Sequence, residues 1–210
     1  MFENLTKMEM FAMLTGTYTA CLIISNIIAG KTFDCFSLIL PCSIIVFPLI
    51  YILNDVLTEI YGYEKVKKVI ILGFIINVFA IVCYNIAMAL PAPSFFENSH
   101  AYSVVLGATL RLLIAGFVAY FIGSFVNAKL MVMLKEWDEE KLFVRCVSST
   151  FFGESLDALI FITLGFFGTM PLESLVIMIA TQAIVKTIYE ILVYPVTRTA
   201  ILFVRKLPEN

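Results

Sequence analysis

Histidine, tryptophan and charged residues are all scarce in this 210-residue sequence. It contains one histidine, His100, and one tryptophan, and only 14% of its residues are charged. Its five cysteines have no CxxC spacing, so neither a disulfide framework nor a cysteine-ligated metal centre is indicated. Catalysis by a serine–histidine pair, or by a metal bound through histidines, therefore has very few candidate residues, and we expect no metal or cofactor.

Another missing feature is a phosphate-binding loop of the GxxxxGKS or GxxxxGKT type, so we expect no ATP hydrolysis by this chain. Hydrophobic residues make up 61% of the sequence, and the mean hydropathy of +0.98 exceeds that of soluble globular domains. Runs long enough to cross a hydrocarbon core of about 30 Å as helices cover residues 10–29, 37–58, 68–90, 104–130, 143–168 and 172–194. The sequence therefore predicts an all-α membrane protein whose six transmembrane helices form a single domain over residues 1–210.

Lysine and arginine are distributed unevenly between the connections, and this distribution predicts the orientation of the chain. Residues 65–68, after the second run, contain three lysines, and residues 135–141, after the fourth run, contain two. Residues 91–103, after the third run, contain none. By the positive-inside rule, the N- and C-termini are expected to be cytoplasmic, which an even number of spans requires.

Several ionisable residues lie inside or at the ends of these apolar runs, where each costs several kcal/mol unless it is paired or hydrated. They are Asp55, Glu59, Arg111, Arg145, Glu154, Asp157, Lys186 and Glu190. Spacings of three or four residues place neighbouring members on shared helix faces. One interpretation is that they only neutralise one another and fix the bundle. The other is that they surround a polar interior, because five acids against three bases leave carboxylates free for a ligand or a proton.

The depth of these residues favours a binding site. Glu154, Asp157, Gln182 and Lys186 fall near the middle of the last two predicted spans, where transporters place their substrates. Asp55 lies nearer the cytoplasm, where it could form an inner gate or pair with Arg145. We therefore expect a central polar pocket between the second, fourth, fifth and sixth spans.

The chemistry of the pocket indicates a class of ligand. A carboxylate accepts two parallel N–H bonds from a guanine-like edge, while an amide or a lysine donates to a carbonyl. A wall of amides and carboxylates therefore suits a flat heterocycle rich in hydrogen-bonding groups. A simple ion would instead require oxygen ligands alone.

Small residues mark places where helices can approach closely. Ala12, Gly16 and Ala20 form such a strip on the first span, and Gly123 and Gly153 are further close-packing points. Internal packing is the first interpretation of the strip. The alternative is contact with a second chain, such as a homodimer partner.

Short motifs follow one another in a characteristic order along nearly the whole chain. They are Ser25-Asn26, Phe47-Pro48, Asn54-Asp55 with Thr58-Glu59 and Gly62, Arg111, Gly123, Arg145, Ser149, Gly153-Glu154, Asp157, Phe161, Lys186, Glu190 and Pro195. Together they resemble the queuosine precursor transporter family, which belongs to the vitamin uptake transporters. The segments around Asp55 and around Glu154 are the most specific parts of this resemblance.

The resemblance implies a bacterial inner-membrane importer of 7-deazaguanine bases for tRNA modification, and not an enzyme. The bases are 7-cyano-7-deazaguanine, 7-aminomethyl-7-deazaguanine or queuine, moved by secondary transport or facilitated diffusion, with or without proton coupling. The implied partners are this small-molecule substrate and the lipid bilayer, without nucleic acid. An alternative is a substrate-binding subunit of an energy-coupling-factor vitamin transporter, in which the strip on the first span would dock the partner.

We expect roles in the site for the residues that the resemblance nominates and for those that the pattern of buried polar residues indicates. The resemblance nominates Asn54, Asp55, Arg111, Arg145, Ser149, Asp157 and Lys186 as site or gating positions. The expected substrate-binding set is Asn54, Asp55, Arg111, Ser149, Glu154, Asp157, Gln182 and Lys186. Glu59, Arg145 and Glu190 are expected to act in gating or ion pairing.

Overall fold

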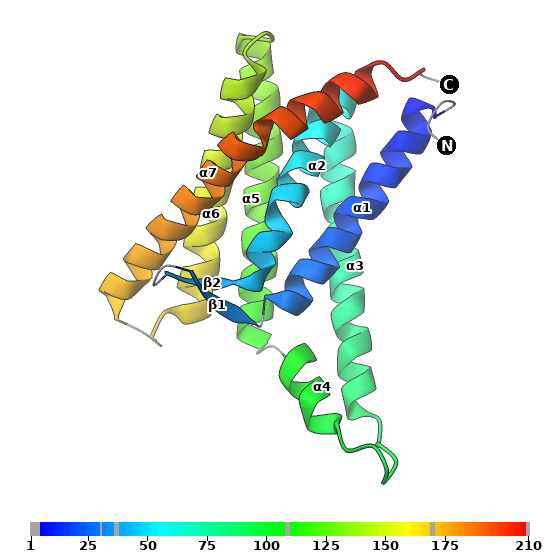
Figure 1. Cartoon of the computed structure of the whole chain (residues 1–210), viewed down its shortest axis with the longest axis vertical. Helices are drawn as coiled ribbons and strands as arrows, with labels where there is room; N and C mark the ends of the chain where they lie inside the picture. Colours follow the sequence, from blue (N-terminus) through cyan, green and yellow to red (C-terminus); the bar gives the residue numbers. More distant parts are fainter. Residues whose placement is uncertain (1–4, 30, 36–37, 108–109, 169–170, 209–210) are drawn as a thin grey trace.

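The computed structural model describes residues 5–29, 31–35, 38–107, 110–168 and 171–208, which form a bundle of helices with one short hairpin (Figure 1). The helices are α1 (Lys7–Ile28), α2 (Phe47–Tyr61), α3 (Tyr63–Ala89), α4 (Ser99–Leu106), α5 (Leu110–Trp137), α6 (Leu142–Phe166) and α7 (Leu172–Arg205). The antiparallel hairpin consists of β1 (Thr32–Cys35) and β2 (Leu38–Pro41), and the 3₁₀ turn η1 (Cys42–Ile45) follows it. The predicted fold class, a helical membrane protein, is confirmed.

The prediction of one continuous helix over residues 37–58 is wrong in its first half. The hairpin strand β2 and the turn η1 occupy that half, and α2 begins only at Phe47, with Pro48 in its first turn. Proline is tolerated at this position because the first turn has no helical partner for its missing N–H. A run of apolar residues does not by itself distinguish a buried strand from a helix, which explains the error.

Five helices are long and apolar enough to cross a membrane, namely α1, α3, α5 from Ile114, α6 and α7. Helix α2 has 15 residues, or about 22 Å at the helical rise, and it is buried at every residue from Ile50 to Glu59. Because neighbouring helices surround α2, it does not need the long apolar surface that lipid contact demands. This burial is also what allows it to carry two carboxylates.

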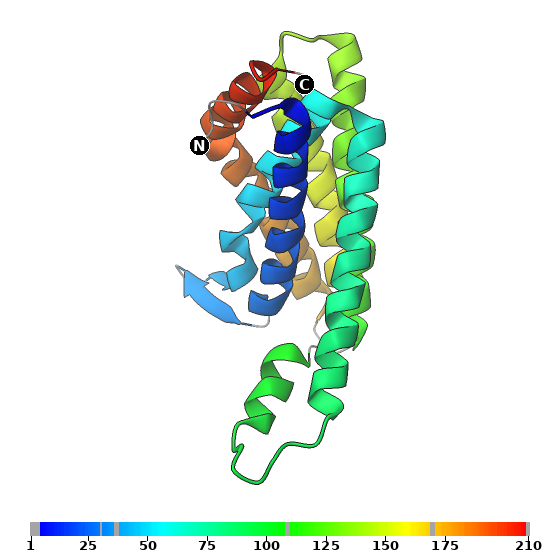
Figure 2. The ribbon, with the colours of Figure 1, turned by 90° about the vertical axis from the view of Figure 1, so that its right-hand side faces the viewer.

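The main helices alternate in direction through the bundle (Figures 1 and 2). Helix α1 runs away from the end that holds both termini, α2 returns, and α3, α5, α6 and α7 continue the alternation. The two ends of the chain meet where the Lys7 N–H donates to the Pro208 carbonyl at 2.8 Å. This arrangement fits an even number of crossings, while the count of six and the cytoplasmic side of the termini stay predictions.

Two predicted connections differ from the structure. The run over residues 104–130 is divided, because α4 ends at Leu106 and α5 begins at Leu110. The three lysines of residues 65–68 lie on the first turns of α3, and only Gly62 separates α2 from α3. Its φ of +79° is a conformation that side-chain-bearing residues rarely adopt, so a glycine here permits the sharp reversal.

Helices α5 and α6 pack with their backbones in close contact. A Cβ placed on Gly153 would lie 2.8 Å from the Asn127 Cβ and 2.9 Å from the Gly123 carbonyl oxygen. This confirms Gly123 and Gly153 as close-packing points. The close approach fixes α6 against α5 and so positions the polar residues that follow Gly153.

The small-residue strip on α1 does not serve internal packing. Ala12, Gly16 and Ala20 are all exposed, and a Cβ on Gly16 would meet nothing within 4 Å. The opposite face of α1 is the buried one, where Tyr18 and Leu22 join the core formed with α2, α3 and α5. The first interpretation of the strip is therefore wrong for the residues that the structure describes.

Candidate functional site

One face of α2 carries four functional side chains at intervals of four residues, Phe47, Tyr51, Asp55 and Glu59. This spacing aligns them along the helix, and α2 packs mainly against α7 on one side and α1 and α5 on others. Their partners on α5, α6 and α7 define three levels of one buried array, which we call the polar seam. The Lys186 level contains Phe47, Tyr51, Glu154, Asp157 and Lys186; the Asp55 level contains Asp55, Cys146, Thr150 and Glu190; the Glu59 level contains Glu59, Lys135, Arg145 and Arg205.

The Lys186 level joins one ammonium group to two carboxylates. Lys186 Nζ lies 2.6 Å from Glu154 Oε2 and 2.8 Å from Asp157 Oδ2. Lys186 and Glu154 are almost completely buried, whereas the Asp157 side chain keeps 19% of its surface exposed. With all three groups ionised, this level carries one net negative charge, and Asp157 is its accessible member.

Two aromatic rings of α2 complete the Lys186 level. Lys186 Nζ lies 4.5 Å from the centroid of the Phe47 ring, a cation–π distance. The Phe47 and Tyr51 rings are stacked, with centroids 6.0 Å apart and an angle of 8° between their planes. The Tyr51 hydroxyl is within hydrogen-bonding reach of Glu154. The sequence analysis named Phe47 only as part of a motif and gave neither ring a role in the site, although their four-residue spacing with Asp55 and Glu59 was a usable signal.

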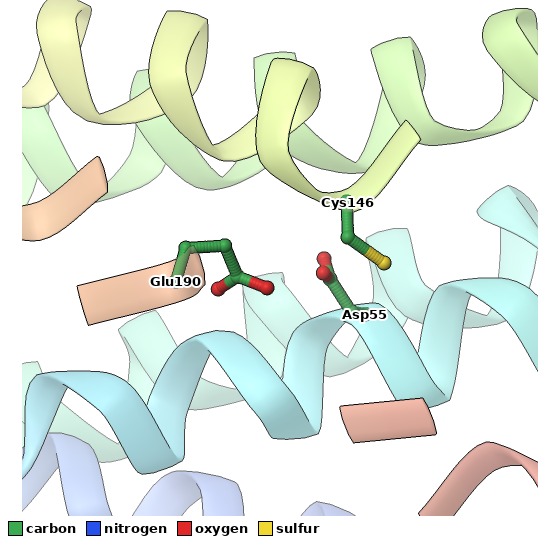
Figure 3. Close-up of side chains that lie close together, drawn as sticks. All are labelled: Asp55, Cys146 and Glu190. Atoms are coloured by element: carbon green, nitrogen blue, oxygen red, sulfur yellow. The ribbon is translucent and has the colours of Figure 1, made fainter. Parts of the chain in front are cut away.

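The Asp55 level brings together two carboxylates and a thiol from three helices. Ligand-type atoms of Asp55, Cys146 and Glu190 lie within 4.8 Å of one another, and all three residues are buried. Figure 3 shows the Asp55 carboxylate between the other two side chains. Among the side chains that the structure describes, no Lys or Arg forms a salt bridge with Asp55 or Glu190.

The Glu59 level is rich in positive charge. Glu59 accepts from Arg145 Nη1 at 2.7 Å and from Lys135 Nζ at 3.0 Å, and Arg205 also donates to it. The suggested pair of Asp55 with Arg145 is therefore wrong, because Arg145 reaches Glu59 instead. Of the three residues expected to act in gating or ion pairing, Glu59 and Arg145 lie paired with each other, and Glu190 has no salt bridge among the described side chains; a gating role stays a prediction. Lys135 and Arg205 were missed because α5 and α7 extend beyond the predicted spans.

The other predicted site residues lie beside the seam or outside the described side chains. Asn54 is buried with its side-chain oxygen unpartnered, and the buried Ser149 hydroxyl donates to the Cys146 carbonyl at 3.1 Å. Gln182 is half-buried on α7, one turn before Lys186. Arg111 lies in the first turn of α5, and its side chain is outside the part of the chain that the structure describes.

Comparisons with known proteins agree with this architecture. A sequence profile of the family described as "Putative vitamin uptake transporter" matches residues 41–200. A "Probable queuosine precursor transporter" of Haemophilus influenzae is 26% identical over 124 residues, which cover 58% of this chain and 49% of the relative. A protein with the same description from Bacillus subtilis is 23% identical over 175 residues, covering 82% of this chain and 74% of the relative. The first match thus spans about half the length of its relative, and no solved structure matches.

The apolar helices and the family match identify a multi-pass protein of the bacterial inner membrane that belongs to a transporter class. Within that class, the chain belongs to the vitamin uptake transporter family, because the family profile covers most of its length. The resemblance described from the sequence motifs is confirmed at the level of the family. All three levels of the seam except Arg205 lie within the matched residues.

Proposed function

We propose that this protein imports queuosine precursors, the 7-deazaguanine bases used for tRNA modification, across the bacterial inner membrane. Family membership and the descriptions of the two relatives support transport of a compound of this class. The observation that carries the proposal is the Lys186 level. There, two carboxylates share one lysine beside a stacked aromatic pair, and such a set matches a flat, guanine-like ligand.

The accessible carboxylate, Asp157, is proposed to accept the ring N–H and the exocyclic amine of the base. Lys186 is proposed to donate to the carbonyl of the base, since an ammonium group has donors only. Lys186 keeps Glu154 as a partner when the base occupies Asp157, so binding leaves no buried charge stranded. The Phe47 ring offers a face on which the heterocycle can stack.

The rest of the expected substrate set extends from this level. Gln182 lies one turn from Lys186 on α7, and Asn54 and Ser149 lie farther along the seam beside the Asp55 level. We propose that they contact the substrate as it moves along the seam toward the end of the bundle that holds the termini. Arg111 remains a proposed substrate contact from the first turn of α5.

Secondary transport or facilitated diffusion is the proposed mechanism, with no catalytic step. The Glu59 level lies at the end of the seam near the termini, where α2 is joined to α5, α6 and α7 by ion pairs. Opening a path on that side requires these pairs to separate. We therefore propose Glu59 and Arg145 as the inner gate.

Uptake by the purified chain in liposomes tests the proposed function. We expect 7-cyano-7-deazaguanine, its 7-aminomethyl form or queuine to exchange across the membrane without any partner protein. Guanine, biotin and thiamine serve as competitors, and guanine should compete more weakly than the preferred deazaguanine. Absence of exchange for all three deazaguanines would refute the proposal.

A second candidate function is favoured by the exposed strip of Ala12, Gly16 and Ala20 on α1. In an energy-coupling-factor transporter, the substrate-binding subunit docks a partner that supplies energy. Under this reading the purified chain would bind a vitamin such as biotin or thiamine tightly and would not move it. The same strip could instead join two copies of this chain, and the molecular mass of the purified protein in detergent distinguishes a dimer from a monomer.

A further inference from the structure

The Asp55 level is the one level of the polar seam in which the described side chains include no cation. Asp55 is 0% and Glu190 2% exposed. Both Asp55 oxygens and Oε1 of Glu190 lack a hydrogen-bond partner of normal geometry. Lys186 forms ion pairs at one end of the seam, and Arg145, Lys135 and Arg205 form ion pairs at the other.

A second buried polar group points into the same place. Thr150 lies one turn after Cys146 on α6, is 0% exposed, and has a hydroxyl oxygen without a partner of normal geometry. This hydroxyl faces Glu190. Four polar side chains from three helices therefore converge on one buried space and leave most of their hydrogen-bonding capacity unused.

Two buried carboxylates at this separation cannot both be ionised without a cation between them. We propose that Asp55 and Glu190 form a proton-binding site, in which the two carboxylates share one proton, and that this proton is the coupling ion of transport. The coupling role rests on the proposed function, whereas the binding of a proton does not. The first arm of the test below therefore needs no substrate.

The surroundings of the pair favour a proton over a larger cation. Sodium or calcium would require about six oxygen ligands, and the described groups here supply two carboxylates, one hydroxyl and a sulfur. The ionisable groups facing the pair from the neighbouring helices are Tyr51, Glu59, Arg145, Cys146 and Glu154. Glu154 shares Lys186 with Asp157, and Arg145 is paired with Glu59, so none of these cations forms an ion pair with Asp55 or Glu190.

The site also lies between two helices whose relative movement during transport would change the distance between the carboxylates. Asp55 is on α2 and Glu190 on α7, and α2 and α7 pack directly against each other. Alternating access moves one group of helices against another. Such a movement separates or hydrates the two carboxylates, which lowers their affinity for the shared proton and releases it on the side then open.

Infrared spectroscopy of the full chain in bilayer discs tests proton binding directly. At about pH 7, well above the usual range for Asp and Glu, wild type should show the carbonyl stretch of a protonated carboxyl group. The signal should vanish in the double variant Asp55→Asn/Glu190→Gln, which replaces the proton-sharing pair, with its one net negative charge, by two neutral amides of similar shape. Glu173→Gln, an exposed change at the start of the same helix α7, should leave it intact. Absence of the band in wild type would overturn the site whether or not any variant folds.

Transport in liposomes tests the coupling role. In wild type, an inward proton gradient should raise the initial uptake of 7-cyano-7-deazaguanine several-fold, and Glu173→Gln should behave alike. In the double variant, the ratio of uptake with the gradient to uptake without it should fall to about one. Exchange by wild type without any response to the proton gradient, or a response to sodium instead, would overturn coupling and leave the proposed function standing. Absence of exchange altogether would refute the proposed function, and the infrared result would still decide the proton site.

Discussion

The residues around Lys186 differ in exposure, and this difference separates a ligand contact from a structural one. Glu154 is as buried as Lys186, whereas Asp157 keeps a fifth of its side-chain surface accessible. Glu154 can therefore neutralise Lys186 in every state of the site. Asp157 is free to exchange the ammonium group for a ligand.

Replacing Asp157 by asparagine should weaken binding while the fold survives. The change swaps one acceptor oxygen for a donor, and the expected loss is about 1–3 kcal/mol, or about five- to 150-fold in Kd for 7-cyano-7-deazaguanine. Lys186 keeps Glu154, so the melting temperature should change little. Titration with the base and a thermal melt in detergent measure both quantities.

Lys186→Met is the matched comparison for this change, because it strands two carboxylates. Its melting temperature should fall well below that of Asp157→Asn, since an unpaired buried charge costs more than a lost acceptor. The ligand assignment would be wrong if Asp157→Asn melted as early as Lys186→Met and bound the base normally.

Glu59 is expected to be the most sensitive carboxylate for stability. Its side chain is fully buried among three cations, of which Arg145 is itself 2% exposed. Among the described side chains, Glu139 also pairs with Lys135 but is exposed, so Glu59→Gln removes the only buried negative charge that these cations contact, and the cost should be about 3–5 kcal/mol. A thermal melt beside Glu140→Gln, an exposed change in the nearby loop, measures it. Equal melting temperatures would show that water or lipid neutralises the cations instead.

At the residue scale, the sequence predicted which polar groups are buried but not which of them pair. Spacing along one helix places Glu154 with Asp157, and Lys186 with Glu190, on single faces, and the structure agrees. Pairing between helices depends on how far one helix is shifted along another, which no local pattern records. For this reason Arg145 was considered for Asp55 and belongs to Glu59.

At the scale of elements, α2 shows why hydropathy alone is an incomplete guide. It is the shortest helix of the main bundle and carries the carboxylates of Asp55 and Glu59, yet it is buried along most of its length. The residues of a helix enclosed by protein have to fit the neighbouring helices, and they do not have to form an apolar surface for lipid. The hairpin before it was unpredictable for a related reason, because its apolar residues continue the composition of α2.

The contact between α5 and α6 gives a prediction of its own. Gly153→Ala would push a methyl group against the Asn127 side chain and the Gly123 backbone, and overpacking of this kind costs about 1–3 kcal/mol. The backbone of Gly123 cannot move without shifting α5. A lower melting temperature is therefore expected.

Gly16→Ala on α1 is the control for the glycine prediction. The same substitution meets nothing within 4 Å there, and alanine favours a helix by up to about 1 kcal/mol over glycine. Its melting temperature should be unchanged or slightly higher. Equal changes in melting temperature for both variants would mean that the contact between α5 and α6 does not determine the result.

At the scale of the whole molecule, the number of times that the chain reverses direction determines the topology, and the number of apolar helices alone does not. Hydropathy finds five spans in the structure, and the short α2 supplies the further reversal that returns the C-terminus to the N-terminal end. The sequence predicted an even topology from six apolar runs, and the alternation of lysine-rich and lysine-poor connections predicted its orientation. It could not predict that the second passage of the chain through the bundle consists of a hairpin, a 3₁₀ turn and a short buried helix.

The orientation that follows can be tested with cysteines introduced at opposite ends of the bundle. Glu97 lies in the connection between α3 and α4, and Glu140 lies in the connection between α5 and α6; both are exposed. The positive-inside rule places residues 135–141 in the cytoplasm. In intact cells, a membrane-impermeant thiol reagent should label Glu97→Cys at once and Glu140→Cys only after permeabilisation. The native Cys21 and Cys146 are buried, and the unsubstituted chain gives the background from all native cysteines. Labelling of Glu140→Cys from outside would show that the orientation is opposite to the predicted one. The Glu59 level would then close the outer end of the seam instead of the inner one.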